Sequence, residues 1–410
     1  MTQAKPAAQH QTLGRTEFVA LMAMLVATIA YSIDAMLPAI PQIGADLSSG
    51  DPNLAQLVVG SFILGLGVGT FFVGAISDAF GRKPVLFWGA VIYAIGAAVA
   101  TLTPSMEALV AARILQGLGA SAARIVALAI IRDLYKGREM ARLMSFVMLV
   151  FALVPAIAPM VGAAILGVTG WRGIFVSFLL FATITTLWTS LRLSEPLPKE
   201  QRSKFELRTL LSAAKEVIAH PMVRLSVAVQ TLCFTMLFAS ISSIQQIMDQ
   251  SFGRGSEFPY WFALIALVAA TGSIVNASLV LRLGMRKLIL VALIGQIAVT
   301  GPILALYLLQ GGSGTGFFVY FPWQVTVFFM IGLTLGNLNA LALEPLGHIA
   351  GMAASITTGI ATVGSVLLSV PIGLAFDGTP VPLLIGVLVC ACVACILTKR
   401  MRSLERNSST

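Results

Sequence analysis

Apolar runs of about 20 residues recur along the whole chain, and they limit its possible folds more than any other feature. The first run begins with FVALMAMLVATIA, residues 18–30, which contains no charged residue. A helix of about 20 apolar residues crosses the ~30 Å hydrocarbon core of a bilayer. Only 10% of the 410 residues are charged and 58% are hydrophobic, whereas soluble domains carry about 25% charged residues. The sequence therefore predicts an all-α polytopic membrane protein.

Twelve such runs form two groups of six. The expected spans are residues 18–39, 54–76, 85–103, 108–131, 142–168, 173–191, 222–247, 259–281, 288–309, 323–343, 351–376 and 381–398. Six-plus-six repeats with a binding site between the halves are frequent in transporters. We therefore expect twelve transmembrane helices in two six-helix halves around a central cavity. The expected organisation is an N-terminal tail (1–17), a first half (18–192), a linker (193–221), a second half (222–398) and a C-terminal tail (399–410).

The formal net charge of +9 reflects membrane topology. Lys and Arg gather in the two tails, in GRKP, in RDLYKGREMAR, in residues 192–224 and in RLGMRK. Outside these segments lie Arg172 and Arg254, while Arg113 and Arg124 lie within spans. With a cytoplasmic N-terminus, this distribution is the positive-inside asymmetry of membrane proteins. We expect both termini in the cytoplasm, a lipid bilayer around the spans and no nucleic-acid partner.

The linker is the one long polar interruption of the chain. Within it, Phe205, Leu210, Ala214, Val217 and Ile218 recur at helical spacing, with basic residues around them. This pattern predicts an amphipathic helix on the inner membrane surface. Its simplest role is to connect the halves, and a regulatory role is the alternative.

Asp34 is a single acid inside an otherwise apolar run. It would lie about 8–9 Å inside the outer face, where an acid costs several kcal/mol unless it is paired, hydrated or protonated. Arg113, in the fourth span, would lie at a similar depth of about 8 Å. We expect Asp34 and Arg113 to couple transport to protons. A permanent ion pair that only orders the bundle is the alternative.

Several further residues are candidates for the walls of the cavity. Arg124 lies about three turns beyond Arg113, where it could attract an anionic group of a substrate or extend to the membrane surface. Apolar and aromatic walls with a few polar groups suit lipophilic compounds, although each aromatic residue could equally pack or face lipid. The expected cavity residues are Tyr31, Gln116, Arg124, Phe234, Phe238, Asn337 and Asn339.

The segment GAISDAFGRKP between the second and third spans combines small residues with charges. Gly74 permits close helix contact. Asp78 can interact with the N-terminus of a neighbouring helix and with Arg82 or Arg132. These contacts would latch the two halves when the outer side is open, and the positive charges also fix topology.

Bends and a second acid complete the expected gate. Pro155 and Pro159 bend the fifth span, and Gly162 lets a neighbour approach closely, although such bends also occur in static bundles. Glu344, at the inner end of the tenth span, either belongs to the gate or caps the next helix. The expected gating residues are Gly74, Asp78, Gly81, Arg82, Lys83, Arg132, Pro155, Pro159, Gly162 and Glu344.

These motifs resemble those of the major facilitator superfamily. The segment from Gly74 matches its Gly-x-x-x-Asp-x-x-Gly-Arg-Lys loop motif, and Arg113, Gln116 and Gly117 fit its fourth-helix motif. The segment APMVG approximates its fifth-helix antiporter motif, with alanine at positions where glycine is expected: Ala158 and Ala163.

The resemblance extends to one group within that superfamily. SIDAMLPAIP, DAFGRKPV, RDLYKGREMARLMSFVMLV and EPLGHIAGMAAS are similar to segments of the Bcr/CflA group of bacterial drug exporters. This resemblance implies proton-driven export of small, drug-like molecules across the bacterial inner membrane. It also implies that Asp34 is the acid of helix 1 and Arg113 the arginine of helix 4.

Other functions remain as alternatives. The same scaffold could export a small metabolite or import one with protons. The sequence has no HExxH or GxxxxGK[ST] motif and only three histidines, so we expect neither a membrane-embedded enzyme nor ATP hydrolysis, and a channel would not need an acid paired with an arginine. Cys390, Cys392 and Cys395 do not share one helix face, which disfavours a metal site. We expect a monomer that needs no cofactor and uses the proton gradient.

Overall fold

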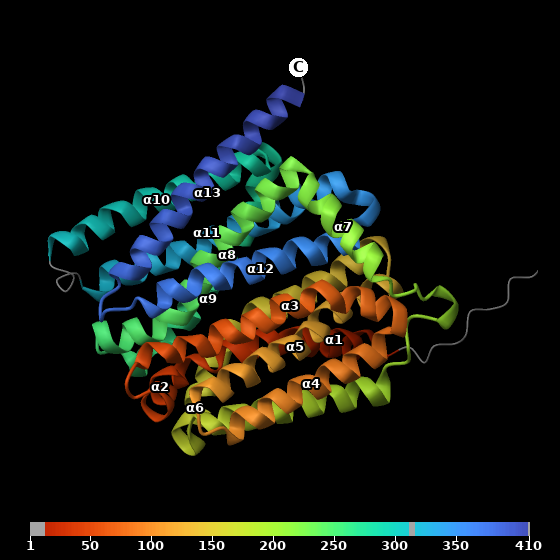
Figure 1. Cartoon of the computed structure of the whole chain (residues 1–410), viewed down its shortest axis with the longest axis horizontal. Helices are drawn as coiled ribbons and strands as arrows, with labels where there is room; N and C mark the ends of the chain where they lie inside the picture. Colours follow the sequence, from red (N-terminus) through yellow and green to blue (C-terminus); the bar gives the residue numbers. More distant parts are fainter. Residues whose placement is uncertain (1–12, 311–315, 409–410) are drawn as a thin grey trace, which may run out of the picture.

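The structure is a computed structural model that describes residues 13–310 and 316–408, with side chains described through residue 401. It is an assembly of long helices (Figure 1). The first half contains α1 (Arg15–Asp34), η1 (Leu37–Ala39), α2 (Ile40–Leu47), η2 (Pro52–Gln56), α3 (Leu57–Phe80), α4 (Arg82–Leu102), α5 (Met106–Leu134) and α6 (Gly137–Arg192). The linker contains η3 (Lys199–Gln201) and α7 (Leu207–Ala219). The second half contains α8 (Pro221–Gln246), η4 (Ile247–Ser251), η5 (Gly255–Glu257), α9 (Phe258–Leu283), α10 (Met285–Leu309), α11 (Phe317–Leu343), η6 (Glu344–Ile349), α12 (Ala350–Leu374) and α13 (Val381–Ser408).

The continuous stretch α6 is two helices joined by a tight reversal. Its 56 residues would extend about 84 Å as one straight helix. The backbone breaks at Gly170, whose φ of 71° and ψ of −177° are not helical. Near its start Glu139 pairs with Arg15, and at its end Arg192 pairs with Glu17 at 2.7 Å. Both ends of α6 therefore lie at the same end of the molecule.

A second reversal separates α11 from α12. The six residues of η6 connect them, and Leu346 within η6 has a non-helical backbone with φ of −114°. Across the described ranges, ten helical stretches are long and apolar enough to cross a membrane. Two of them, Gly137–Arg192 and Phe317–Leu374, each contain two crossings. The twelve spans predicted from the sequence are thereby confirmed.

The two halves lie one beside the other, the first in red to yellow and the second in green to blue (Figure 1). They meet along two seams, α3 against α12 and α6 against α9. Along the first seam, α3 presents glycines every seven residues. A Cβ atom added to Gly60 would lie 3.1 Å from Val370, one added to Gly67 would lie 3.0 Å from Thr362, and one added to Gly74 would lie 3.3 Å from Ser355. Small residues at this spacing let two helices approach closely over their whole length.

The linker helix α7 defines one end of the molecule, here called the linker end, and the opposite end with η2 is called the far end (Figure 1). Leu210, Ala213 and Val217 of α7 are buried in a cluster with Val227 of α8 and Ile356 of α12. The amphipathic helix expected in the linker is therefore docked on the second half, because its apolar side is covered by protein. Four other large apolar residues of this segment remain exposed: Phe205, Leu207, Leu211 and Ile218.

Candidate functional site

Arg113 lies at the centre of the first half, where α1, α3 and α5 meet. Glycines bring α3 and α5 together, since a Cβ atom on Gly117 would lie 2.0 Å from the carbonyl oxygen of Phe62. The Arg113 side chain is fully buried. It donates from Nε to the Val58 carbonyl at 3.0 Å and from Nη2 to the Ser32 carbonyl at 3.0 Å. The guanidinium therefore ties the backbones of α1 and α3 together.

Two further contacts complete the surroundings of Arg113. Its Nη1 donates to Gln116 Oε1 at 2.6 Å, and its guanidinium carbon lies 4.4 Å from the centre of the Phe62 ring. Gln116 is itself fully buried. The predicted fourth-helix residues Arg113 and Gln116 thus form one buried polar unit inside the first half.

Asp34 is the last residue of α1 and is 4% exposed. Its carboxylate makes no hydrogen bond and no ion pair within 4.0 Å to any residue in the described part of the chain. Arg113 instead binds the carbonyl of Ser32, two residues earlier. The Arg113 side chain therefore reaches the end of α1 where Asp34 lies, but the two predicted coupling residues do not form an ion pair.

Close packing fixes the backbone around Asp34. A Cβ atom on Gly162 of α6 would lie 2.0 Å from the carbonyl oxygen of Ala35, so only glycine allows α6 to approach the end of α1 this closely. Ser32 Oγ and Tyr93 Oη are 2.6 Å apart, which links α1 to α4. The expected bend residues Pro155 and Pro159 both lie inside α6.

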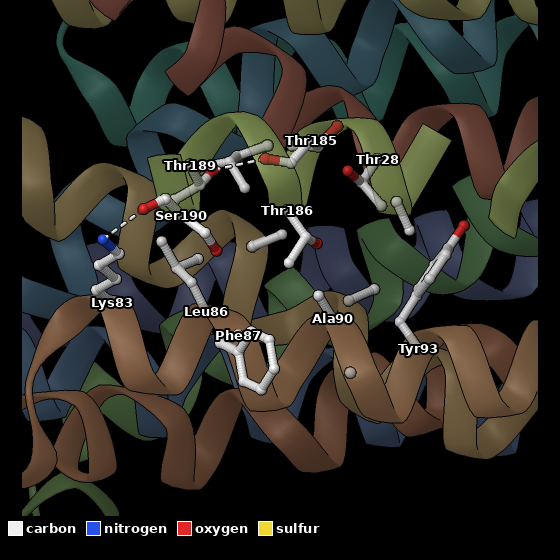
Figure 2. Close-up of a pocket in the computed structure, with 15 residues that line it drawn as sticks. Thr28, Lys83, Leu86, Phe87, Ala90, Tyr93, Thr185, Thr186, Thr189 and Ser190 are labelled. Atoms are coloured by element: carbon white, nitrogen blue, oxygen red, sulfur yellow. Dashed lines mark hydrogen bonds between the residues drawn. The ribbon is translucent and has the colours of Figure 1, made fainter. Parts of the chain in front are cut away.

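A small cavity lies within the first half, between α1, α4, α5 and α6 (Figure 2). Its volume is about 30 Å³, which is room for about one water molecule. At one end Lys83 donates from Nζ to the Ser190 carbonyl at 2.7 Å. Isolated threonines on apolar helices form no motif, so the sequence alone does not single out the four that line this cavity: Thr28, Thr185, Thr186 and Thr189.

The two halves part at the linker end. Two adjoining cavities, of about 190 Å³ and about 410 Å³, lie between α3 and α5 of the first half and α12 of the second. The deeper, smaller cavity is lined by Thr70, Ser121, Arg124, Ser355 and Thr358, among others. The larger cavity, nearer the linker, is lined in part by Asp78, Arg82, Arg132 and His348.

At the far end the halves are joined by side-chain amides. Gln56 Nε2 donates to Gln246 Oε1 at 2.7 Å and to the Gly373 carbonyl at 3.0 Å. Gln246 Nε2 donates to Asn53 Oδ1 at 2.6 Å, and Asn53 donates to the Phe376 carbonyl at 2.8 Å. These residues, called here the amide clasp, close the far end while the linker end is open. The sequence alone does not indicate them, because Gln56 and Gln246 stand far apart in the chain and belong to no motif.

The loop between α3 and α4 is held by charges. Gly81 turns the chain with a φ of 103°, which only glycine adopts readily. Arg82 donates from Nη1 to Asp78 Oδ1 at 2.5 Å and from Nε to Asp133 Oδ2 at 2.7 Å. Of the two partners expected for Asp78, the structure therefore selects Arg82, and Arg132 makes no hydrogen bond or ion pair with the described residues.

The linker contributes to the same loop. Glu195 accepts hydrogen bonds from the backbone N–H groups of Arg82 and Lys83, each at 2.9 Å. These N–H groups have no partner within the helix because they begin α4. A carboxylate there also suits the positive end of the helix dipole. The sequence alone does not indicate a role for Glu195, since its partners lie more than a hundred residues away in the chain.

The sequence places this architecture in a known family. A sequence model of the Major Facilitator Superfamily matches residues 19–370. The chain belongs to the major facilitator superfamily. It is 30% identical over 339 residues, 82% of this chain and 83% of the relative, to an uncharacterized MFS-type transporter, YdgK, of Bacillus subtilis (strain 168).

This major facilitator transporter is also similar to a resistance protein in sequence and to a sugar transporter in fold. It is 26% identical over 388 residues to a bicyclomycin resistance protein homolog of Haemophilus influenzae, which covers 92% of this chain and 94% of the relative. This similarity supports the resemblance to the Bcr/CflA group. The crystal structure of a D-xylose-proton symporter has the same fold, with a TM-score of 0.71 at 16% identity, covering 93% of this chain and 97% of the other.

Of the cavity residues predicted for this transporter, Arg124 lines the deeper cavity at the linker end, whereas the others lie outside both cavities there. Tyr31 hydrogen-bonds Ser177 at 2.8 Å inside the first half, and Asn337 donates to Asn276 at 2.6 Å inside the second. The polar groups of Tyr31 and Asn337 form hydrogen bonds within one half, so these side chains do not face the opening between the halves.

The remaining predicted residues lie on the second half. Phe234 and Phe238 stack with ring centres 5.4 Å apart, and Asn339 accepts a hydrogen bond from Gln230 at 2.9 Å. Glu344 begins η6 and is exposed, without a hydrogen bond or ion pair to the described residues. It therefore joins no latch in this conformation.

Proposed function

We propose that this transporter exports small, drug-like molecules from the bacterial cytoplasm in exchange for protons. One observation carries the proposal: a single buried carboxyl, Asp34, lies beside the α1 carbonyl held by Arg113 and has no ion partner among the described residues. An isolated acid inside a membrane protein is costly as a charge and marks a proton relay. The similarity to a bicyclomycin resistance protein homolog supports export of toxic compounds.

The positive-inside distribution of Lys and Arg supports a cytoplasmic location for the linker end and for both termini, in the inner membrane. The conformation described here is then inward-facing, with the amide clasp closed toward the outside. In this orientation the cavity beside Arg124 receives its cargo from the cytoplasm.

The proton step follows from the neighbours of Asp34. A protonated Asp34 is compatible with the inward-facing arrangement, in which Arg113 is occupied by the Ser32 carbonyl and Gln116. If Arg113 turns toward Asp34, the positive charge stabilises the carboxylate and the proton leaves. Opening of the far end then exposes the carboxylate to reloading from the outside. The chain needs no cofactor or catalytic reaction for this cycle and acts as a monomer.

The alternative on the same scaffold is export of a metabolite, or its import together with protons. The direction of proton movement during transport separates import from export. Susceptibility of cells that gain or lose the protein, measured over many toxic compounds with and without an uncoupler, separates drugs from metabolites. If the protein protects cells from toxic compounds and the uncoupler abolishes this protection, the result supports drug export.

The decisive experiment uses purified protein in liposomes with a fluorescent pH indicator and a compound identified by the susceptibility profile. Asp34→Asn should fold and insert but should neither consume a proton gradient nor move cargo uphill. Asp46→Asn is the matched control, because Asp46 is an exposed acid that accepts a hydrogen bond from Trp171 at 2.8 Å. Uphill transport by Asp34→Asn at the normal rate would show that the proposed coupling is wrong.

A further inference from the structure

We infer that Arg124 on α5, with Ser355 and Thr358 on α12, forms a binding site for an anionic group of the transported molecule. The inference rests on the proposed function, because the site lies in the cavity assigned to the cargo. It names the chemical class of that cargo as carboxylates and related oxyanions attached to an apolar body.

Arg124 is a cation that has no counterion in the part of the chain that the structure describes. It lines the deeper cavity and lies with its guanidinium carbon 5.9 Å from the centre of the Phe151 ring. It makes no hydrogen bond or ion pair with any residue in the described part of the chain. A guanidinium presents planar N–H donors that match a carboxylate, so this side chain is prepared for an anion.

The other charged residues that line the two cavities also favour an anion over a cation. Arg132 lies two turns along α5, lines both cavities and also has no partner among the described residues. Among the described residues, Asp78 is the single acidic one that lines either cavity, and it is already bound to Arg82. Asp34, the buried acid of α1, does not line them. Among the residues that the structure describes, a cationic compound in these cavities therefore meets two unpaired arginines and no free carboxylate.

The hydroxyl groups around Arg124 divide into two kinds. Thr70 and Ser121 donate their hydroxyl protons to carbonyls of their own helices, at 2.8 Å and 2.7 Å. Ser355 and Thr358 make no hydrogen bond with the described residues, so their hydroxyl protons are free to be donated. These two lie one turn apart on α12, so they share a face of that helix.

The site therefore draws on both halves of the molecule. The cation comes from α5 of the first half, and the free hydroxyl donors come from α12 of the second. An anion bound by all three bridges the gap at the linker end. Such bridging favours closure of that end around the cargo, because the bound state gains contacts that neither half supplies alone.

The test measures binding to the purified full-length protein of three probes that share one aromatic body: 4-phenylbenzoate, 4-phenylbenzamide and 4-phenylbenzylamine. The carboxylate should bind about 10- to 100-fold more tightly than the amine, as expected for hydrogen bonds to a charged group. Arg124→Gln should remove this preference, and Arg124→Lys should keep part of it. Ser355→Ala and Thr358→Val should each weaken binding of the carboxylate probe several-fold.

Arg142→Gln is the control, since Arg142 is an exposed arginine that lines neither cavity, and it should leave all three affinities unchanged. Preference for the amine, an unchanged preference in Arg124→Gln, or binding of none of the probes would overturn the inference. The outcome is separable from proton coupling. A preference for the carboxylate without proton movement would support this site and overturn the proposed antiport. Antiport of a neutral cargo without a preference for the carboxylate would support the antiport and overturn this site.

Discussion

At the end of α1, the position of the Asp34 carboxyl depends on a residue of another helix that has no side chain. Gly162 approaches the Ala35 carbonyl so closely that a Cβ atom there would lie 2.0 Å from the oxygen. Neither backbone can move without disturbing the other packed helices. The geometry of the coupling residues therefore depends on a contact in which neither of them takes part.

Replacing Gly162 by alanine should destabilise the protein by about 1–3 kcal/mol, the usual cost of overpacking a well-packed interior. It should also impair proton-coupled transport, because α6 displaces the end of α1. The matched control is Gly167→Ala in the same helix, where an added Cβ atom meets nothing within 4 Å. Thermal unfolding in detergent and transport in liposomes measure both effects. Equal unfolding temperatures for the two variants would contradict this account.

At the scale of helices and their connections, the amide clasp decides which end of the molecule is closed. Its hydrogen bonds join η2 of the first half to α8 and to the end of α12. All of its groups are uncharged amides and carbonyls, so its closure does not require a change in protonation. Each such hydrogen bond contributes about 0.5–1.5 kcal/mol, which is enough to shift a two-state equilibrium several-fold.

Gln56→Leu should therefore shift the population toward a far-end-open state. Spin labels at Asp51→Cys and Asp377→Cys, two exposed far-end positions in different halves, report this change in a background without the native cysteines. The distance distribution should gain a longer component in Gln56→Leu. Gln201→Leu, in the exposed linker segment η3, should leave it unchanged. A distribution identical to the parent protein would show that the clasp does not hold the gate.

The sequence predicted elements better than it predicted contacts between them. Hydropathy gives the number and order of spans because each must cross a bilayer by itself. The Asp78–Arg82 pair was predictable because both residues belong to one local motif. The Gln56–Gln246 bond was not, because it depends on how two distant helices pack. The hydrogen bonds of Tyr31 and Asn337 within their own halves were unpredictable for the same reason, because they too depend on how helices pack.

At the scale of the whole molecule, the seam between α3 and α12 keeps the halves in contact along their length while the linker end is parted. Gly60, Gly67 and Gly74 hold this seam close through small surfaces. We expect motion between the halves to be a rocking about this packed line, with the amide clasp and the α3–α4 loop at its two ends. The order of apolar spans indicated two halves, but only the packed structure shows which helices lie along the seams between them.

The anion site proposed at Arg124, which has no ion partner among the described residues, has a consequence for energy supply. If the cargo is a monoanion and one proton enters as it leaves, two charges move with the membrane voltage in each cycle. Each charge contributes about 2.3 kcal/mol per 100 mV. In liposomes with a potassium diffusion potential and no pH gradient, the voltage dependence of carboxylate export should be about twice that of an uncharged cargo. Equal dependence for the two would contradict this stoichiometry. A cell whose external medium turns alkaline, and whose pH gradient vanishes, would still expel acidic compounds on voltage alone.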